Sequence, residues 1–300
     1  MFRIISDSGC DFTKEEIQRF GIDIVPFYIT FDQSTFLKEG VDITKEDYFN
    51  RLLKDKSLYP KTAQPSPQDY IDVYTPHLKA GKDIICVTIS SKLSGTYNSA
   101  TLAADTLKDD YPDRTIIIID SLNVAIGQGL LLREMLKMRD KGYNATETAR
   151  IAEEIKKTIR IYFTLDSLEY LRRGGRVGPT TALVGGILGL RPILQVVDGA
   201  VDQLDSVRGK RNSLSLIEEG VVAALKGDIH NINLSVAHIL NEGDAMSLKT
   251  SLEASLDMKI TNPVAEIGAS VGTHAGPGAL AIAYCKKHDA IMAAAMAAAS

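Results

Sequence analysis

The first half of the chain alternates short apolar runs with amphipathic segments. The apolar runs are rich in β-branched residues, which predicts buried strands rather than helices. These runs lie at residues 2–5, 23–31, 84–89 and 115–120. Strands that are separated by helices in this way predict parallel βαβ units in one open sheet.

The segments between these strands carry helix signals. Thr13, with Glu16 three residues later, predicts a capping box, and Gly21 predicts the end of that helix. Thr44 opens a second helix, and Pro67 suits the first turn of a third. Helices are therefore expected near residues 14–20, 45–54, 67–80, 124–141 and 146–158, with a loop over residues 57–66.

The pattern changes near Arg160, where strand candidates begin to follow one another more closely. Asp198 and Gly199 separate two of these candidates and predict a hairpin, so the second sheet is expected to be partly antiparallel. Strands are expected at residues 161–164, 191–197, 201–207, 232–239 and 259–267, and helices at 212–225 and 243–256.

We therefore predict an α/β protein with two domains. Residues 1–160 would form a parallel-sheet domain, and residues 161–287 an α+β domain with a mixed sheet. The Ala-rich tail, residues 288–300, is either a terminal helix or a poorly defined end, and no function is assigned to it.

Composition narrows the classes of function. The 300 residues are 45% hydrophobic and 24% charged, with a formal net charge of -4, which is typical of a globular protein and argues against nucleic-acid binding. The three cysteines form no CxxC pair, so we expect a reducing, cytoplasmic location. No apolar run approaches the ~20 residues that cross a bilayer, so stable membrane insertion is not expected. The few residues before Asp7 are too short for a signal peptide.

Hydroxyl residues follow the predicted strand at residues 84–89. Ser90, Ser91, Ser94 and Thr96 lie where a helix is expected to begin, and free backbone N–H groups at such a position can bind an anion. Ser94 can donate to a carboxylate, or it can simply cap the helix; in the first case Thr96 is available as the cap.

Two further loops offer groups for the same ligand. The segment KTAQPSP, residues 61–67, places Thr62 among prolines, although it also suits a plain approach to a helix. In RRGGRVG, residues 172–178, three arginines among glycines suit a carboxylate or phosphate, or form a solvated basic loop. The apolar, glycine-rich residues 179–190 could pack as a helix or line a tunnel.

His274 lies in GTHAGPG, residues 272–278, which we expect to be a loop of small residues. A single histidine is more often structural, but its small neighbours favour a position facing a ligand. The other histidines lack the spacing of metal ligands, so no metal is predicted. A hydrolase that pairs Ser94 with His274 would lack the G-x-S-x-G motif, and no Walker A loop is present.

Six motifs in this order resemble those of the DegV family of fatty-acid-binding proteins, and the resemblance extends to about Lys287. The motifs are IISDS (4–8), KTAQPSP (61–67), ISSKLSGTY (89–97), YLRRGGRV (170–177), RPIL (191–194) with DG (198–199), and GTHAGPG (272–278).

The resemblance implies a Rossmann-like N-terminal domain and one long-chain fatty acid, such as palmitate, held between two domains. It implies that Thr62 and Ser94 anchor the carboxylate, with Arg176 and His274 also at the site; Arg173 is the competing arginine. It further implies no catalytic residue and no cofactor, a fatty-acid kinase as the partner that makes an acyl phosphate, and Arg208 as a candidate contact to that kinase.

The leading hypothesis is thus a non-catalytic lipid carrier. The alternative is an enzyme, either a phosphotransferase on a small carbonyl compound or a Ser94-based hydrolase. A third hypothesis is an oligomer-forming regulator that senses lipid. The carrier is physically reasonable because burying about 15 methylenes at ~0.8 kcal/mol each supplies roughly 12 kcal/mol of gross driving force.

Overall fold

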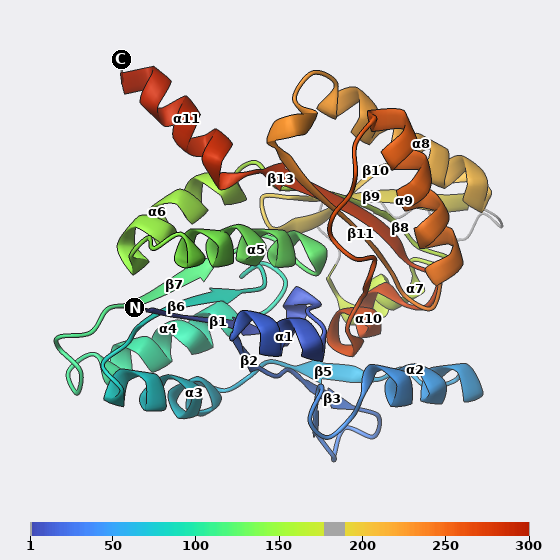
Figure 1. The fold of residues 1–300 in the computed structure, drawn as a ribbon. Coiled ribbons are helices and arrows are strands. Elements are labelled where there is room, and N and C mark those ends of the chain that lie inside the picture. Colours follow the sequence, from blue (N-terminus) through green and yellow to red (C-terminus); the bar gives the residue numbers. More distant parts are fainter. Residues whose placement is uncertain (1, 177–189, 300) are drawn as a thin grey trace.

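The computed structural model describes residues 2–176 and 190–299, which form three sheets and the helices that cover them (Figure 1). The N-terminal sheet is parallel, as predicted, and its strand order is β2-β1-β6-β7. Alternate strand residues face opposite sides: Ile5 and Ile84 pack under α3 and α4, whereas Ile4 and Ile85 join the core shared with α5 and α6. The strands are β1 (Phe2–Asp7), β2 (Asp23–Val25), β6 (Asp83–Thr88) and β7 (Ile116–Asp120).

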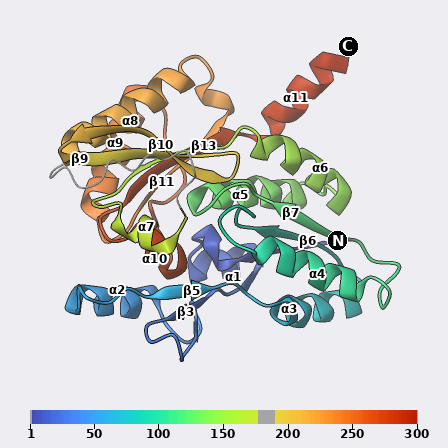
Figure 2. The same cartoon turned by 180° about the vertical axis from the view of Figure 1, so that it is seen from behind.

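Helices lie on both faces of this sheet, with α3 and α4 on one side and α5 and α6 on the other (Figures 1 and 2). The capping predictions are confirmed: Thr13 and Glu16 form the capping box of α1, and Gly21 ends it at φ 58°. Ser66 and Asp69 form a second box before Pro67. The helices are α1 (Lys14–Phe20), α2 (Lys45–Lys54), α3 (Pro67–Lys79), α4 (Thr96–Leu107), α5 (Ile126–Asp140) and α6 (Ala145–Lys156).

The single strand predicted over residues 23–31 is wrong. Pro26 interrupts it because proline has no N–H to donate to a ladder, and the chain leaves the parallel sheet after β2. The second part pairs in a separate antiparallel sheet of order β4-β3-β5, and the loop predicted over residues 57–66 contains one of its strands. These strands are β3 (Tyr28–Thr30), β4 (Leu37–Lys38) and β5 (Lys61–Ala63).

The third sheet is mixed, as predicted, with strand order β10-β9-β8-β13-β11-β12. Asp198 (φ 47°) and Gly199 (φ 85°) form the predicted hairpin between β9 and β10. The strand predicted over residues 259–267 is wrong except for its last part. The strands are β8 (Arg160–Thr164), β9 (Leu190–Val197), β10 (Ala200–Arg208), β11 (Ile232–His238), β12 (Ala265–Glu266) and β13 (Leu280–Lys286).

Strand β13 was not predicted, yet it lies at the centre of the third sheet between β8 and β11. The side chains on its two faces differ in size. Leu280, Ile282 and Tyr284 pack with the helices α8 (Lys210–Leu225) and α9 (Glu242–Leu256). Ala281 and Ala283 face the core shared with α5. Their small side chains leave space on that face of the sheet.

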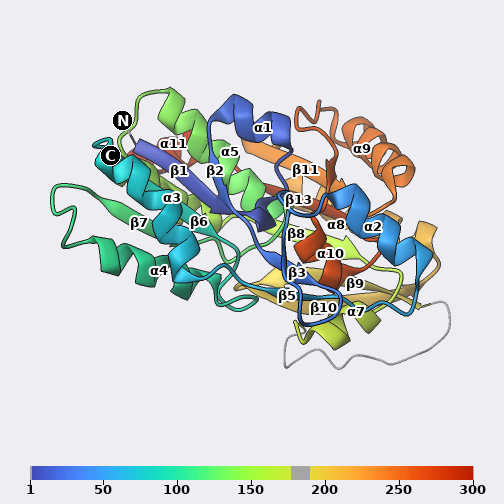
Figure 3. The same ribbon diagram turned by 90° about the horizontal axis from the view of Figure 1, so that it is seen from below.

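The remaining helices are short or lie near the C-terminus. Seen from below, α10 lies beside β3 and β5, and α7 is close by (Figure 3). The tail forms a terminal helix, α11, which was one of the two alternatives expected for it. This helix extends away from the rest of the fold (Figure 2). Within the described residues, no helix has both the length and the apolar character to span a bilayer. These elements are η1 (Ser8–Cys10), α7 (Glu169–Gly174), η2 (Ile229–Asn231), α10 (Ala269–Ala275) and α11 (His288–Ala299).

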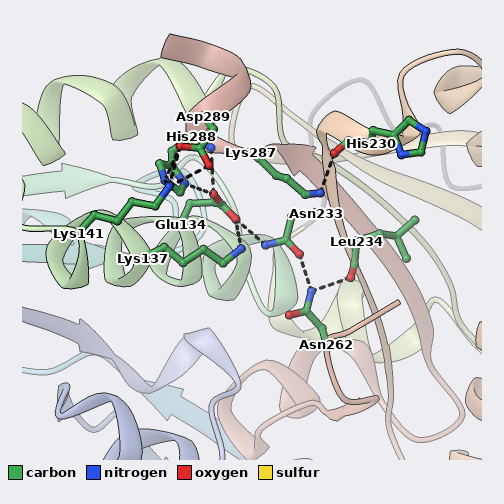
Figure 4. A network of polar contacts seen from close by, with 10 residues as sticks. All are labelled: Glu134, Lys137, Lys141, His230, Asn233, Leu234, Asn262, Lys287, His288 and Asp289. Carbon is green, nitrogen blue, oxygen red and sulfur yellow. Dashed lines mark hydrogen bonds and ion pairs between the residues drawn. The ribbon is translucent and has the colours of Figure 1, made fainter. Parts of the chain in front are cut away.

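A buried polar network joins α5 to the third sheet (Figure 4). Glu134 of α5 is fully buried and accepts hydrogen bonds from Lys137 Nζ at 2.6 Å, Asn233 Nδ2 at 2.8 Å and His288 Nδ1 at 2.6 Å. Asn262 extends the network to Asn233 at 2.7 Å. We call this set of residues the Glu134 junction.

Candidate functional site

A cavity of about 370 Å³ lies between the parallel sheet and the third sheet, which is within the usual range for small-molecule sites. Most of its wall is apolar. The apolar lining residues are Phe27, Ala63, Ile89, Leu93, Val124, Ala125, Ile161, Phe163, Leu171, Val201, Ile267, Val271, Ala275, Ala279 and Ala281. The polar lining residues are Thr62, Gln64, Ser94, Arg176, Ser270 and His274.

The apolar wall depends on the small residues of β13. Ala281 pairs with Phe163 of β8, and both line the cavity. The carboxyl end of the parallel sheet supplies Ile89, and the start of α5 supplies Ala125. Ligands commonly bind beyond the carboxyl ends of parallel strands, so the cavity lies where the sequence predicts one.

Thr62 and His274 are 212 residues apart in the sequence but meet at the cavity. The Oγ1 atom of Thr62 in β5 is 3.0 Å from Nε2 of His274 in α10. The prediction of a loop around His274 is wrong, because α10 ends at Ala275, immediately after His274. Small residues let this short helix pack closely. At Gly272, for example, an added Cβ would lie only 2.9 Å from the Phe49 ring.

Ser94 lies just before α4 and faces the cavity. It is not the helix cap, since Gly95 holds that position and makes no side-chain cap bond. Thr96 was expected to be available as the cap, but it is buried in the first turn, with its Oγ1 atom 2.6 Å from the Tyr70 hydroxyl. Ser94 Oγ accepts the Thr96 N–H at 3.3 Å. No acceptor among residues 2–176 and 190–299 takes the hydroxyl proton of Ser94, which can therefore be donated to a ligand.

Of the two competing arginines, Arg176 lines the cavity. Its Nε donates to the Leu93 carbonyl at 3.2 Å, next to Ser94, and its Nη1 donates to the Gly174 carbonyl. Arg173 lies in α7 and bonds Glu169 instead, at 2.7 Å, with its guanidinium over the Tyr59 ring. Residues 177–189, on which most of the predicted tunnel lining falls, lie outside the described residues.

The imidazole of His274 is neutral at physiological pH. Burial, together with the positive charge of Arg176, lowers its pKa to about 4. Its ring lies against Gly174, where an added Cβ would come within 2.1 Å of Nδ1. Among residues 2–176 and 190–299, no hydrogen-bond partner meets this Nδ1 atom.

Two buried carboxylates hold the start of α10, and no motif in the sequence points to them. Asp11 accepts the Gly268 N–H at 2.8 Å, and Glu39 accepts the Ser270 N–H at 3.0 Å. Burial raises the pKa of Asp11 to about 7, although Lys45 acts in the opposite direction. The wall of the cavity that carries His274 is therefore fixed by residues from the N-terminal half of the chain.

Gln64 and Ser270 are cavity residues that the sequence analysis missed. Gln64 donates to Ser99 at 3.1 Å and so ties the Thr62 segment to α4. It lies two residues after Thr62 in the same predicted motif, which is the signal that could have identified it. Ser270 precedes His274 by about one helical turn, but its position depended on recognising α10 as a helix.

Arg208 and the alternative hydrolase pair of Ser94 and His274 were also predicted from the sequence. Arg208 ends β10, is exposed and does not line the cavity. A hydrolase would need a base beside Ser94, but His274 Nε2 bonds Thr62. In the part of the chain that the structure describes, no group of three or more His, Cys, Asp or Glu side chains could hold a metal ion.

Comparison with known proteins gives consistent matches over most of the chain. A family profile described as "uncharacterised protein, DegV family" matches residues 1–287. A DegV domain-containing protein of Caldanaerobacter subterraneus subsp. tengcongensis is 32% identical over 288 residues, covering 95% of this chain and 98% of the relative. A DegV domain-containing protein of Clostridium perfringens is 32% identical over 288 residues, covering 95% and 99%.

Solved structures show the same fold. A stearic-acid-binding protein from Eubacterium ventriosum is 30% identical, with a TM-score of 0.92 over 97% of this chain and 100% of that one. A DegV family protein from Thermus thermophilus, described by its fatty acid binding, is 26% identical with a TM-score of 0.86, covering 95% and 99%.

Proposed function

The chain belongs to the DegV family, and from that premise we propose that it binds one long-chain fatty acid in the cavity and presents the carboxylate to a fatty-acid kinase. The observation that carries this proposal is the composition of the cavity wall. A mostly apolar wall surrounds a small polar group that includes Thr62, Ser94, Arg176 and His274.

This division of the wall suits the two parts of a fatty acid. The alkyl chain would supply most of the affinity, because each buried methylene contributes about 0.8 kcal/mol. The head group then needs only to be oriented, and two hydroxyl groups can do this without burying the carboxylate in a tight ion pair. The similar protein from Eubacterium ventriosum is described as binding stearic acid, which supports the ligand class.

The presenting role concerns what happens to the bound acid. In this proposal the chain has no catalytic residue of its own, and an ATP-dependent kinase in the cytoplasm converts the carboxylate to an acyl phosphate. Exposed Arg208 is the proposed contact to that kinase, and palmitate is the proposed ligand.

The first experiment is native mass spectrometry of the protein purified from bacteria, followed by extraction and identification of the released molecule. A stoichiometric long-chain fatty acid is the expected result. A protein that is empty and also takes up no added palmitate would contradict the carrier function and favour an enzyme.

The second experiment separates binding from presentation. Thr62→Ala and Ser94→Ala are expected to weaken palmitate binding about 5- to 10-fold, since each removes one hydrogen bond to a charged group. They should reduce kinase-dependent phosphorylation by a larger factor, because orientation is lost as well. Ser91→Ala, an exposed serine outside the cavity wall, is the matched control and should change neither. Equal losses in both assays would contradict the presenting role.

A further inference from the structure

The contact between Thr62 and His274 leaves open which of the two residues donates. A threonine hydroxyl has one proton and two lone pairs, and a neutral imidazole has one N–H and one acceptor nitrogen. If Thr62 donates to Nε2 over the 3.0 Å contact, its hydroxyl offers a ligand only lone pairs. If Nε2–H donates, the hydroxyl proton of Thr62 is free. The direction therefore decides whether Thr62 attracts or repels a carboxylate.

We infer that His274 donates from Nε2 to Thr62 Oγ1 and thereby points the single hydroxyl proton of Thr62 at the head group of the ligand. His274 is in this view a positioning residue that acts through Thr62, not a direct contact to the ligand. The inference rests on the proposed function, because it assumes that the head group is a carboxylate.

The surroundings of the ring favour this tautomer. Nδ1 is buried against Gly174 and meets no hydrogen-bond partner within residues 2–176 and 190–299. A proton on Nδ1 would leave a buried N–H without an acceptor, which is rarer in proteins than an under-satisfied acceptor. A proton on Nε2 instead has Thr62 Oγ1 as its acceptor. The doubly protonated ring is disfavoured because burial and Arg176 lower the pKa of His274 to about 4.

Ser94 shows the same arrangement independently. Its Oγ accepts the N–H of Thr96 at 3.3 Å, so one lone pair is used, and within the described residues the proton has no acceptor. Arg176 also places its Nε and Nη1 on backbone carbonyls, those of Leu93 and Gly174, and among residues 2–176 and 190–299 its Nη2 meets no acceptor. Thr62, Ser94 and Arg176 are thus each held by the protein in a way that leaves a hydrogen-bond donor for a ligand in the cavity. A carboxylate, which only accepts hydrogen bonds, matches this set.

The first test needs no ligand. Nitrogen-15 NMR of the ligand-free protein between pH 6 and 8, with His274→Gln used to assign the resonances, reports which ring nitrogen carries the proton. A protonated Nε2 supports the inference, and a protonated Nδ1 overturns it.

The second test is a double-mutant cycle measured as palmitate affinity. His274→Gln keeps an amide donor that can reach Thr62 and is expected to stay within about twofold of the wild type, whereas His274→Asn is too short and should lose about 5- to 10-fold. In a Thr62→Val background, His274→Asn should cause no further loss, because its partner is already gone.

Additive losses in the cycle would overturn the inference and make His274 a direct contact. Urea denaturation of each variant shows whether it is folded. If the folded wild type binds no palmitate, the proposed function fails, and the NMR measurement still decides the tautomer separately.

Discussion

The buried carboxylates of Glu134 and Asp11 each join the N-terminal half of the chain to the C-terminal half, and their surroundings differ. Glu134 is surrounded by donors from α5, β11 and the start of α11 (Figure 4). Burial alone would raise its pKa, but hydrogen bonds from Lys137 and His288 lower the pKa below its ordinary value. The Glu134 carboxyl therefore stays ionised within the junction.

Asp11, which contacts the residue that precedes α10, has no such set of donors. Its Oδ1 accepts one backbone N–H, and Oδ2 has no partner among the described residues. Glu39 lies close by, since both carboxylates approach Gly268, and this like charge adds to the effect of burial on the Asp11 pKa. One connection between the halves is thus fully paired, whereas the one beside the cavity keeps a carboxylate oxygen without a partner among the described residues.

The largest effect is expected where the pairing is complete. Glu134→Ala leaves Asn233 and His288 without their buried acceptor and should lower the free energy of unfolding by about 3–5 kcal/mol. Urea denaturation measures this. Glu154→Ala, which removes an exposed pair with Lys157, is the control and should cost less than about 1 kcal/mol. Similar losses for both variants would show that the Glu134 junction is not special.

A smaller effect with the opposite sign is expected at Asp11. An unfolded aspartate has a pKa of about 3.9, so the folded state, with a pKa of about 7, keeps a proton that the unfolded chain has lost. The contribution of Asp11 to stability therefore falls as pH rises from about 4 to 7. Asp11→Asn removes this penalty. Its free energy of unfolding, relative to that of the wild type, should therefore be higher at pH 8 than at pH 5 by ~1–3 kcal/mol.

Denaturation at several pH values measures the difference between Asp11→Asn and the wild type. Asp55→Asn is the control, because Asp55 is exposed and Ser57 lowers its pKa, so that it stays ionised from pH 5 to 8. A difference between wild type and Asp11→Asn that does not change with pH would refute the raised pKa.

Gly174→Ala disturbs the cavity side without touching the Glu134 junction. The new methyl group would overlap the His274 ring and displace it from Thr62, so palmitate affinity should fall about tenfold while urea denaturation changes little. Gly220→Ala, at a helical position with open space around it, is the matched control and should leave binding intact. Unchanged affinity for Gly174→Ala would show that the ring position is unimportant.

The smallest effect concerns the pH dependence of binding. The pKa of His274 is lowered to about 4 in the folded protein, from about 6.5 in the unfolded chain. Its contribution to folding stability is therefore complete above pH 6.5 and declines as the pH falls towards 4. Between pH 7 and 8 the ring stays neutral, and palmitate affinity should vary by less than about twofold. Calorimetric titration at several pH values tests this, and a transition centred near pH 6.5 to 7.5 would contradict it.

Local signals in the sequence were sufficient for much of the fold. Caps at Thr13 and Thr44 act within one helical turn, and the apolar run before Ser90 contains enough β-branched residues to predict a strand. The cavity residues Thr62, Ser94, Arg176 and His274 were also named from short motifs, although their roles stay predictions.

The errors arose where distant contacts decide the structure. Strand β13 is rich in alanine, which has little strand preference, and it forms because β8 and β11 pair with it on both sides. Two partners of Glu134, Asn233 and His288, are 99 and 154 residues away, so no spacing in the sequence links them to it. The short helix α10 is held by contacts from the N-terminal half, which local propensity does not contain.

The central place of β13 also affects the synthesis of the protein. This strand ends at Lys286, yet it separates β8 from β11 and supplies Ala281 to the cavity. When a ribosome has made only the first 270 residues, the third sheet still lacks the strand that separates β8 from β11. Because domains fold as units during translation, the binding cavity can close only after Lys286 has left the ribosome.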